Sequence, residues 1–137
     1  VNTLLENRRL LKDKYMRSLL KPEISPGKDI NMDFLQKVTD IIYQEMHDHK
    51  FSSITLANKL NMSISQLNRK LSAVSGYSSS LYIMKLKIDR AKKKLAIENK
   101  NIGDIAAECG FYDVAYFSRT FKRHTQVTPS QYRNLPK

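Results

Sequence analysis

Leu56-Ala57-Asn58-Lys59-Leu60-Asn61-Met62 recurs 49 residues later as Ile105-Ala106-Ala107-Glu108-Cys109-Gly110-Phe111. Downstream the offset becomes 50, where Leu67-Asn68-Arg69-Lys70-Leu71 aligns with Phe117-Ser118-Arg119-Thr120-Phe121, so the second copy has one extra turn residue. A short apolar-patterned segment, a turn of about four residues and a second such segment is the length pattern of a helix-turn-helix. The sequence therefore predicts two helix-turn-helix units, at about residues 53–75 and 102–124.

The second helix of each unit is predicted to have one apolar face and one face of small or polar residues. A small outer face lets a helix approach a duplex closely, and Asn and Arg can bind adenine and guanine bidentately from the major groove. The side chains on these outer faces are Ser65, Asn68, Arg69 and Ser72 in the first copy and Ala115, Ser118, Arg119 and Lys122 in the second. One copy alone would fit an ordinary two-helix hairpin equally well. Two copies in register favour DNA binding.

A single long helix is predicted between the two units, over about residues 79–97. Apolar residues there alternate at spacings of three and four and form one stripe: Leu81, Met84, Ile88, Ala91 and Leu95. A helix of about 19 residues spans roughly 28 Å, close to the ~34 Å between successive major grooves on one side of DNA. Its other face carries basic residues that we expect to be solvated or to lie near phosphates: Lys85, Lys87, Arg90, Lys92, Lys93 and Lys94. Strand signals are weak, so we expect an all-α fold of two units joined by this helix.

The charge balance predicts an anionic partner. The 137-residue chain has 24 Lys and Arg against 13 Asp and Glu, a net charge of +11 and a pI near 9.8. Residues 32–137 hold 17 of the basic and 9 of the acidic side chains, so +8 of the charge lies there. Nucleic acid is the first candidate and an anionic membrane surface the second.

Other classes of protein find little support in the sequence. The single cysteine, Cys109, cannot form an internal disulfide. His47-Asp48-His49 sets its imidazoles on different helix faces, so we expect no metal site. No apolar run approaches the ~20 residues that cross a bilayer, so we expect a cytoplasmic chain without membrane contact. No catalytic arrangement or phosphate-binding loop is recognisable, so we expect neither enzyme activity nor a cofactor.

Residues 1–31 are expected to be an appendage to the main domain at 32–137. Its apolar residues recur at spacings of seven and four between basic ones and predict a basic amphipathic helix: Leu4, Leu11, Tyr15 and Leu19. Lys21–Lys28 holds two of the four prolines and is typical of a linker. Because the sequence begins with Val1 and not with Met, we expect a longer parent protein.

Several runs of the second unit resemble the C-terminal signature of AraC/XylS-type transcription regulators. They are Ile102-Gly103-Asp104-Ile105-Ala106, Gly110-Phe111, Tyr116-Phe117-Ser118-Arg119-Thr120-Phe121-Lys122-Arg123 and Thr128-Pro129-Ser130-Gln131-Tyr132-Arg133. The resemblance covers about residues 33–135 and departs from the family at Gln126, usually Gly, and at Lys87, usually Arg. Gln126 therefore predicts a non-glycine residue at positive φ, at a cost of roughly 1 kcal/mol. Carried over by position, the family's base-facing places are Ser65, Asn68, Arg69, Val114, Ala115, Ser118 and Arg119.

Phosphate contacts are expected from helix N-termini and from polar or basic side chains around the same helices. The candidates are Ser53, Ser63, Lys70, Gly103, Asp104, Tyr112, Lys122 and Arg123.

The N-terminal segment is similar to the helix that joins a receiver domain to such an output domain in hybrid two-component regulators. Leu5-Glu6-Asn7-Arg8-Arg9-Leu10-Leu11 carries this resemblance. It implies an upstream receiver-like domain and a homodimer held through upstream parts, with RNA polymerase as a further partner.

Together these observations predict sequence-specific binding of double-stranded DNA, with two recognition helices in adjacent major grooves, as the output of a transcription regulator. Two alternatives stay open. One is a non-specific or RNA-binding basic protein, and the other is a helix-turn-helix module that docks proteins.

Overall fold

The computed structural model describes residues 26–136, which form seven helices and no strand. The helices are α2 (Pro26–Glu45), α3 (Ser53–Lys59), α4 (Ile64–Ser75), α5 (Ser79–Ile97), α6 (Ile102–Glu108), α7 (Val114–Thr125) and α8 (Pro129–Arg133). The all-α prediction is confirmed, and the long helix has the predicted bounds.

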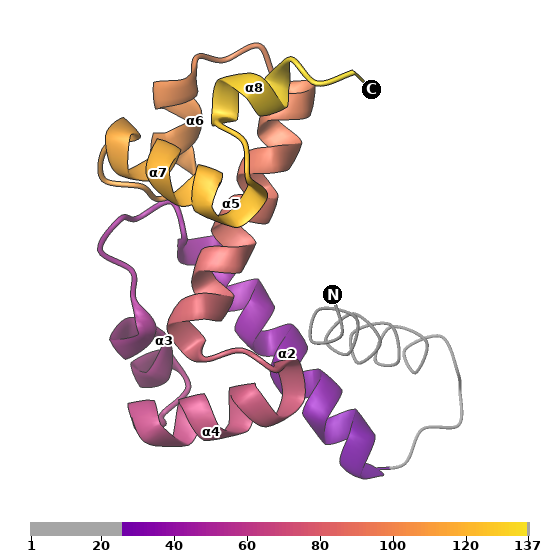
Figure 1. Ribbon diagram of the computed structural model, residues 1–137. Helices are drawn as coiled ribbons and strands as arrows, with labels where there is room; N and C mark the ends of the chain where they lie inside the picture. The colour runs from indigo at the N-terminus through magenta and orange to yellow at the C-terminus, as the bar shows by residue number, and fades with distance from the viewer. Residues whose placement is uncertain (1–25, 137) are drawn as a thin grey trace.

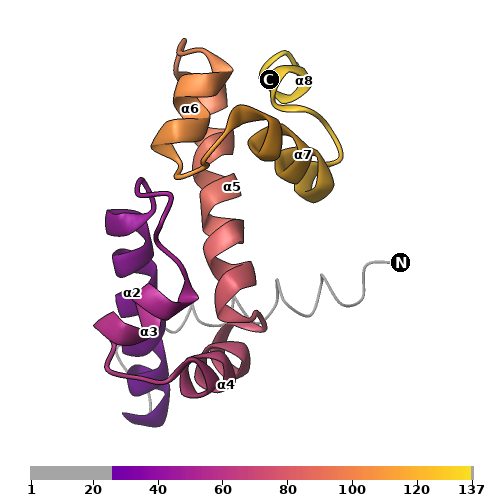
Figure 2. The same ribbon diagram turned by 90° about the vertical axis from the view of Figure 1, so that its left-hand side faces the viewer.

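Helix α5 is the spine of the molecule and carries one helix-turn-helix unit at each end (Figures 1 and 2). Its first half packs on α2, α3 and α4, where Tyr82, Ile83 and Leu86 join the first core. Its second half packs on α6 and α7, where Ala91 and Leu95 join a second core. The predicted apolar stripe is confirmed for Met84, Ile88, Ala91 and Leu95, which pack in or against the second core. The prediction missed a second buried face of α5, which packs in the first core. Leu81, predicted within the stripe, is 38% exposed.

The internal repeat extends from the sequence to the hydrogen bonds of the backbone. Ser63 caps α4 by accepting from the Gln66 N–H at 3.1 Å, and Asp113 caps α7 by accepting from the Tyr116 N–H at 2.6 Å. Ser63 and Gln66 together form a capping box. The two helices therefore begin at equivalent residues, 50 positions apart.

Helices α4 and α7, the predicted recognition helices, also end alike. Gly76 terminates α4 with φ of 82° and Gln126 terminates α7 with φ of 72°, so the strained position predicted for Gln126 is confirmed. Within the turns, Asn61 and Gly110 both have positive φ and lie 49 residues apart. The extra residue of the second copy is consequently in the stretch between Gly110 and Asp113.

Helix α2 begins at Pro26, inside the stretch predicted as a linker. Proline fits the first turn of a helix because the N–H that it lacks has no helical partner there. The linker prediction is thus wrong for residues 26–28, while the rest of that stretch and the amphipathic helix before it lie outside the described residues.

The two units meet where Gly110 packs against the end of α2. A Cβ atom at Gly110 would lie 1.7 Å from the Met46 carbonyl oxygen, so no side chain fits between them. On the other side, the Lys87 ammonium donates to the Gly110 carbonyl at 3.2 Å. The absence of a side chain at Gly110 therefore allows the second unit to pack closely against the end of α2.

Candidate nucleic-acid interface

Helices α4 and α7 point their N-terminal ends to the same side of the molecule, the left in Figure 1 and toward the viewer in Figure 2. Each end lies near one end of the α5 spine. The N-terminal residues of a recognition helix are the ones that contact base edges in helix-turn-helix complexes. The fold thus presents two such ends to one side, as two adjacent grooves require.

Most of the predicted base-facing residues are solvent-exposed in this arrangement. The exposed ones are Ser65, Arg69, Val114, Ala115 and Arg119, while Ser118 is half-buried. Arg69 and Arg119 occupy equivalent places in the two helices. Neither guanidinium forms a hydrogen bond or ion pair within residues 26–136, so both are available to an outside partner.

Asn68 departs from the expected pattern because its amide oxygen already has partners. Its Oδ1 accepts from the Ser79 N–H at 2.8 Å and from the Ser79 hydroxyl at 2.6 Å, which ties α4 to the start of α5. A bidentate contact with adenine requires this oxygen. The second copy has Pro129 in place of Ser79, so it has no N–H to satisfy and tolerates Ser118. The structure thus gives Asn68 a positioning role that its residue type did not reveal.

The predicted phosphate-contacting residues fall into two groups by their present partners. Lys122 and Arg123 are exposed in the last turn of α7, and Tyr112 is 78% exposed beside the His49 ring. Others are exposed but have partners within the chain: the Ser63 hydroxyl caps α4, and the Lys70 ammonium lies 4.4 Å from the centre of the Phe34 ring.

Three predicted phosphate sites lie at the starts of short helices. The half-buried Ser53 hydroxyl is 2.9 Å from that of Ser79. Gly103 and Asp104 are exposed in the first turn of α6, but its N-cap is Asn101, whose Oδ1 accepts from the Asp104 N–H at 2.7 Å. The cap of α6 is therefore two residues before Gly103, the first of the positions that the sequence singled out.

The basic face predicted for α5 is largely used inside the protein. Lys87 is buried under Gly110, where burial lowers the pKa of its ammonium group. Arg90 donates to the Tyr43 carbonyl at 3.2 Å. Lys94 lies 2.8 Å from a Glu108 oxygen in an ion-pair cluster that joins α5 to α6. The expectation that these three are solvated or lie near phosphates is wrong, because each already has a partner within the chain.

The same cluster explains a low carboxyl pKa. Glu108 accepts from Lys100 at 2.7 Å and from Lys94 at 2.8 Å, and these hydrogen bonds lower its pKa to about 2. The net positive charge that reaches solvent is correspondingly smaller near this end of α5.

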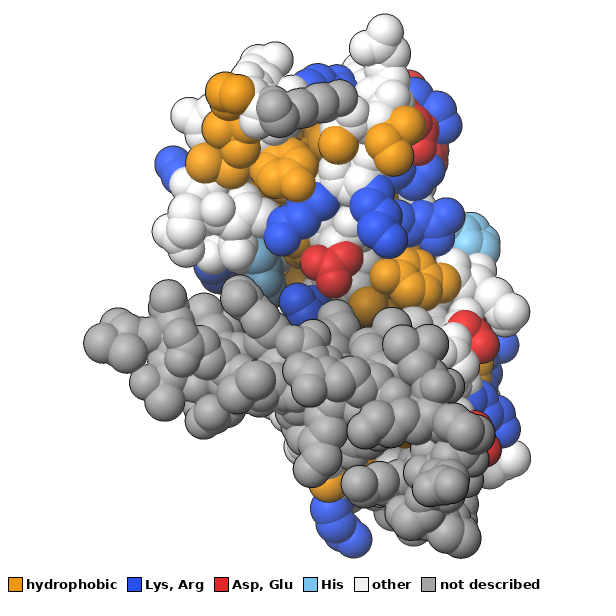
Figure 3. All heavy atoms as spheres, turned by 90° about the vertical axis from the view of Figure 1, so that its right-hand side faces the viewer, with side chains coloured by type: hydrophobic (Ala, Val, Ile, Leu, Met, Phe, Trp, Pro, Cys, Tyr) orange, Lys and Arg blue, Asp and Glu red, His pale blue; other side chains and the backbone are white. Residues whose placement is uncertain are grey.

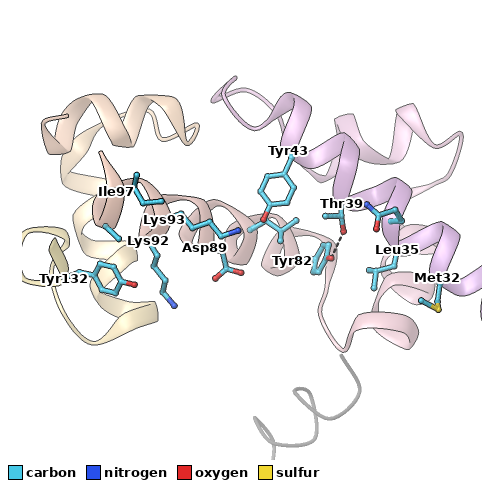
Figure 4. Close-up of a pocket in the computed structure, with 13 residues that line it drawn as sticks. Met32, Leu35, Thr39, Tyr43, Tyr82, Asp89, Lys92, Lys93, Ile97 and Tyr132 are labelled. Atoms are coloured by element: carbon cyan, nitrogen blue, oxygen red, sulfur yellow. Dashed lines mark hydrogen bonds between the residues drawn. The ribbon is translucent and has the colours of Figure 1, made fainter. Parts of the chain in front are cut away.

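The face away from the recognition helices carries a groove of about 620 Å³ between α2, α5 and α8 (Figures 3 and 4). Apolar side chains such as Met32, Leu35 and Ile97 line it together with Asp89 and Lys92. Cys109 lies outside it and is buried, and this burial raises the pKa of its thiol to about 11. Within residues 26–136 no group of three or more His, Cys, Asp or Glu could hold a metal, and no helix is long and apolar enough to cross a membrane.

Comparison with known proteins places this arrangement in context. Residues 56–135 match the family described as Helix-turn-helix domain. The transcriptional regulator SirC of Salmonella typhimurium is 37% identical over 94 residues, covering 69% of this chain and 31% of that protein. Histidine kinase P4 of Formosa agariphila is 28% identical over 135 residues, covering 98% of this chain and 10% of that protein. The chain thus spans about a third of the length of SirC and about a tenth of the length of histidine kinase P4.

Solved structures show the same architecture. The C-terminal domain of the two-component response regulator yesN from Fusobacterium nucleatum superposes with a TM-score of 0.70 at 29% identity, covering 74% of this chain and 99% of that one. An AraC-type DNA-binding domain-containing regulator from Chromobacterium violaceum gives 0.68 at 25% identity, covering 82% and 100%. The DNA-binding domain of AdpA, solved with a target DNA, gives 0.67 at 22% identity, covering 72% of this chain and 88% of that one.

Proposed function

Because the chain belongs to the AraC-type helix-turn-helix family of DNA-binding transcription regulators, we propose that it reads one duplex site with α4 and α7 in two adjacent major grooves. The observation that carries this proposal is the pair of exposed arginines, Arg69 and Arg119, each at the sixth position of a helix whose N-terminal end faces the same side. The 19 residues of α5 set a spacing of roughly 28 Å between the units. That distance approaches the pitch of B-DNA.

The mechanism in this proposal is equilibrium binding without a chemical step, in the compartment that holds the DNA. Exposed basic side chains such as Lys122 and Arg123 release counterions from the backbone and position the protein. Arg69 and Arg119 donate in pairs to guanine and select the sequence. The two groups of residues therefore differ in how their loss affects binding.

Replacing Arg69 or Arg119 by Ala is expected to cost ~1–3 kcal/mol and to relax base preference at one localised position in its own half of the site. Replacing Lys122 by Ala should instead weaken all sequences alike and lower the slope of log K against log salt by about one. Site selection from random duplexes, followed by titration at several salt concentrations, measures both effects. If both arginine variants lost the same affinity for every sequence, the proposal that these arginines contact bases would be contradicted.

The same experiment separates the two alternatives. Wild-type affinity that is indifferent to duplex sequence, or higher for RNA, would favour a non-specific basic protein. Unchanged regulation by the parent protein after both arginines are replaced would favour a docking module. No described contact favours either alternative over duplex reading.

We further propose that the parent protein couples this domain to an upstream receiver-like domain through residues 1–20 and dimerises through its upstream parts. The response-regulator domain from Fusobacterium nucleatum supports this architecture by its similarity over three quarters of the chain. RNA polymerase would be the further partner of the DNA-bound regulator.

Dimerisation upstream would tether two DNA-binding domains at an effective concentration near millimolar, if a linker of roughly ten residues acts as a flexible chain. Tandem sites should then bind the parent protein far more tightly than they bind this chain. This chain should be mainly monomeric, because one short amphipathic segment is a weak dimer seam. Sedimentation of both proteins, with titration on one and two sites, measures this. A stable dimer of this chain, or no gain for a dimeric parent on paired sites, would contradict the tether.

A further inference from the structure

Ile64 and Val114 are the first residues of the two recognition helices and occupy equivalent places in the repeat, 50 positions apart. They are branched aliphatic side chains, yet they are 40% and 47% exposed. The family resemblance predicts Val114 at the interface, whereas Ile64 is not among the predicted residues. The signal that could have found Ile64 is its alignment with Val114.

Both residues lie in the first turn of a helix whose N-terminal end faces the proposed DNA side. Ser65 and Ala115 follow them with small side chains and are themselves exposed. Both helices begin at a capped N-terminus, with Ser63 and Asp113 as the caps, so the backbone that carries each aliphatic group is well defined. Each recognition helix thus presents one fixed apolar group at its leading end.

Among the base edges in the major groove, the 5-methyl group of thymine is the apolar one. An aliphatic side chain there gains by removing this methyl from water, whereas it offers no hydrogen bond to the other bases. We propose that Ile64 and Val114 each contact a thymine methyl, one in each half of the site. This proposal rests on the proposed duplex reading and adds a specificity element to it.

The arrangement of the helices predicts where the two thymines lie. Because α4 and α7 approach from one side with the same end leading (Figures 1 and 2), the two contacts repeat in the same sense along the duplex. Their separation should be about one helical turn, or roughly 10 base pairs. The preferred site therefore contains thymine at both positions, near the guanines read by Arg69 and Arg119.

The test replaces each thymine of the selected site, one at a time, by deoxyuridine, which lacks only the 5-methyl group. We expect two positions about one turn apart at which wild-type affinity falls roughly threefold to fivefold, as for one lost apolar methyl contact. Ile64→Ala should abolish the sensitivity at one position and Val114→Ala at the other. Each variant should keep its sensitivity at the position that it does not contact.

Ile97→Ala is the matched control, because Ile97 is an 82% exposed aliphatic residue on the face with the groove. It should leave affinity and both deoxyuridine effects unchanged, and circular dichroism should show all three variants folded. Deoxyuridine sensitivity that persists unchanged in Ile64→Ala and Val114→Ala, or a selected site without thymine at a one-turn spacing, would overturn the proposal. If the wild-type protein showed no sequence preference at all, the proposed function of sequence-specific duplex binding would itself be contradicted.

Discussion

Replacing Gly110 by Ala is expected to destabilise the domain by about 3 kcal/mol or more. Two causes add. The new Cβ would lie 1.7 Å from the Met46 carbonyl oxygen, so backbone must move, and overpacking of this kind costs ~1–3 kcal/mol or more. Gly110 also has φ of +86°, where an L residue costs roughly 1–2 kcal/mol.

Chemical denaturation of the wild-type and variant proteins measures this loss as a shift of the unfolding midpoint. Gly103→Ala is the matched control, because its Cβ would meet only the Asn101 Oδ1 at 3.4 Å within a helix. Alanine is a better helix former than glycine, so this control should be neutral or gain up to about 1 kcal/mol. A Gly110 variant as stable as this control would show that the two units do not depend on their contact at Met46.

Replacing Ala91 by Pro should break the α5 spine, with a loss of about 3 kcal/mol or more. Proline removes a helical hydrogen bond and its ring clashes with the carbonyl one turn earlier, at Lys87. Ala91 is fully buried and belongs to the second core, so we expect the unit of α6 and α7 to suffer more than that of α3 and α4. Binding to the half of the site read by α7 should be lost first.

Footprinting on the selected site, together with circular dichroism, checks this order of loss. Ala91→Gly keeps the helix continuous and should cost only about 1 kcal/mol, with both grooves still protected. If the proline variant protected both grooves with wild-type affinity, α5 would not act as a rigid spacer between the units.

Helix positions were predictable because their signals are local. Ser63 and Gln66 form their capping box from neighbouring residues, and the apolar spacing of α5 gave its bounds. The family's usual glycine at position 126 similarly predicted the positive φ found at Gln126. Each of these features depends on residues within a few positions of one another, which is the range that a sequence pattern reports.

What the sequence alone determined is therefore the all-α class, the two repeated units and the small polar faces of their second helices. Tertiary packing decided which polar groups remain available: it engaged the Asn68 oxygen with Ser79, and it buried Lys87 beneath Gly110. It also brought the N-terminal ends of α4 and α7 to one side of the molecule. These outcomes depend on groups far apart in the chain, and a buried or hydrogen-bonded side chain cannot be told from an exposed one by residue type, because the free energy of each depends on its partner.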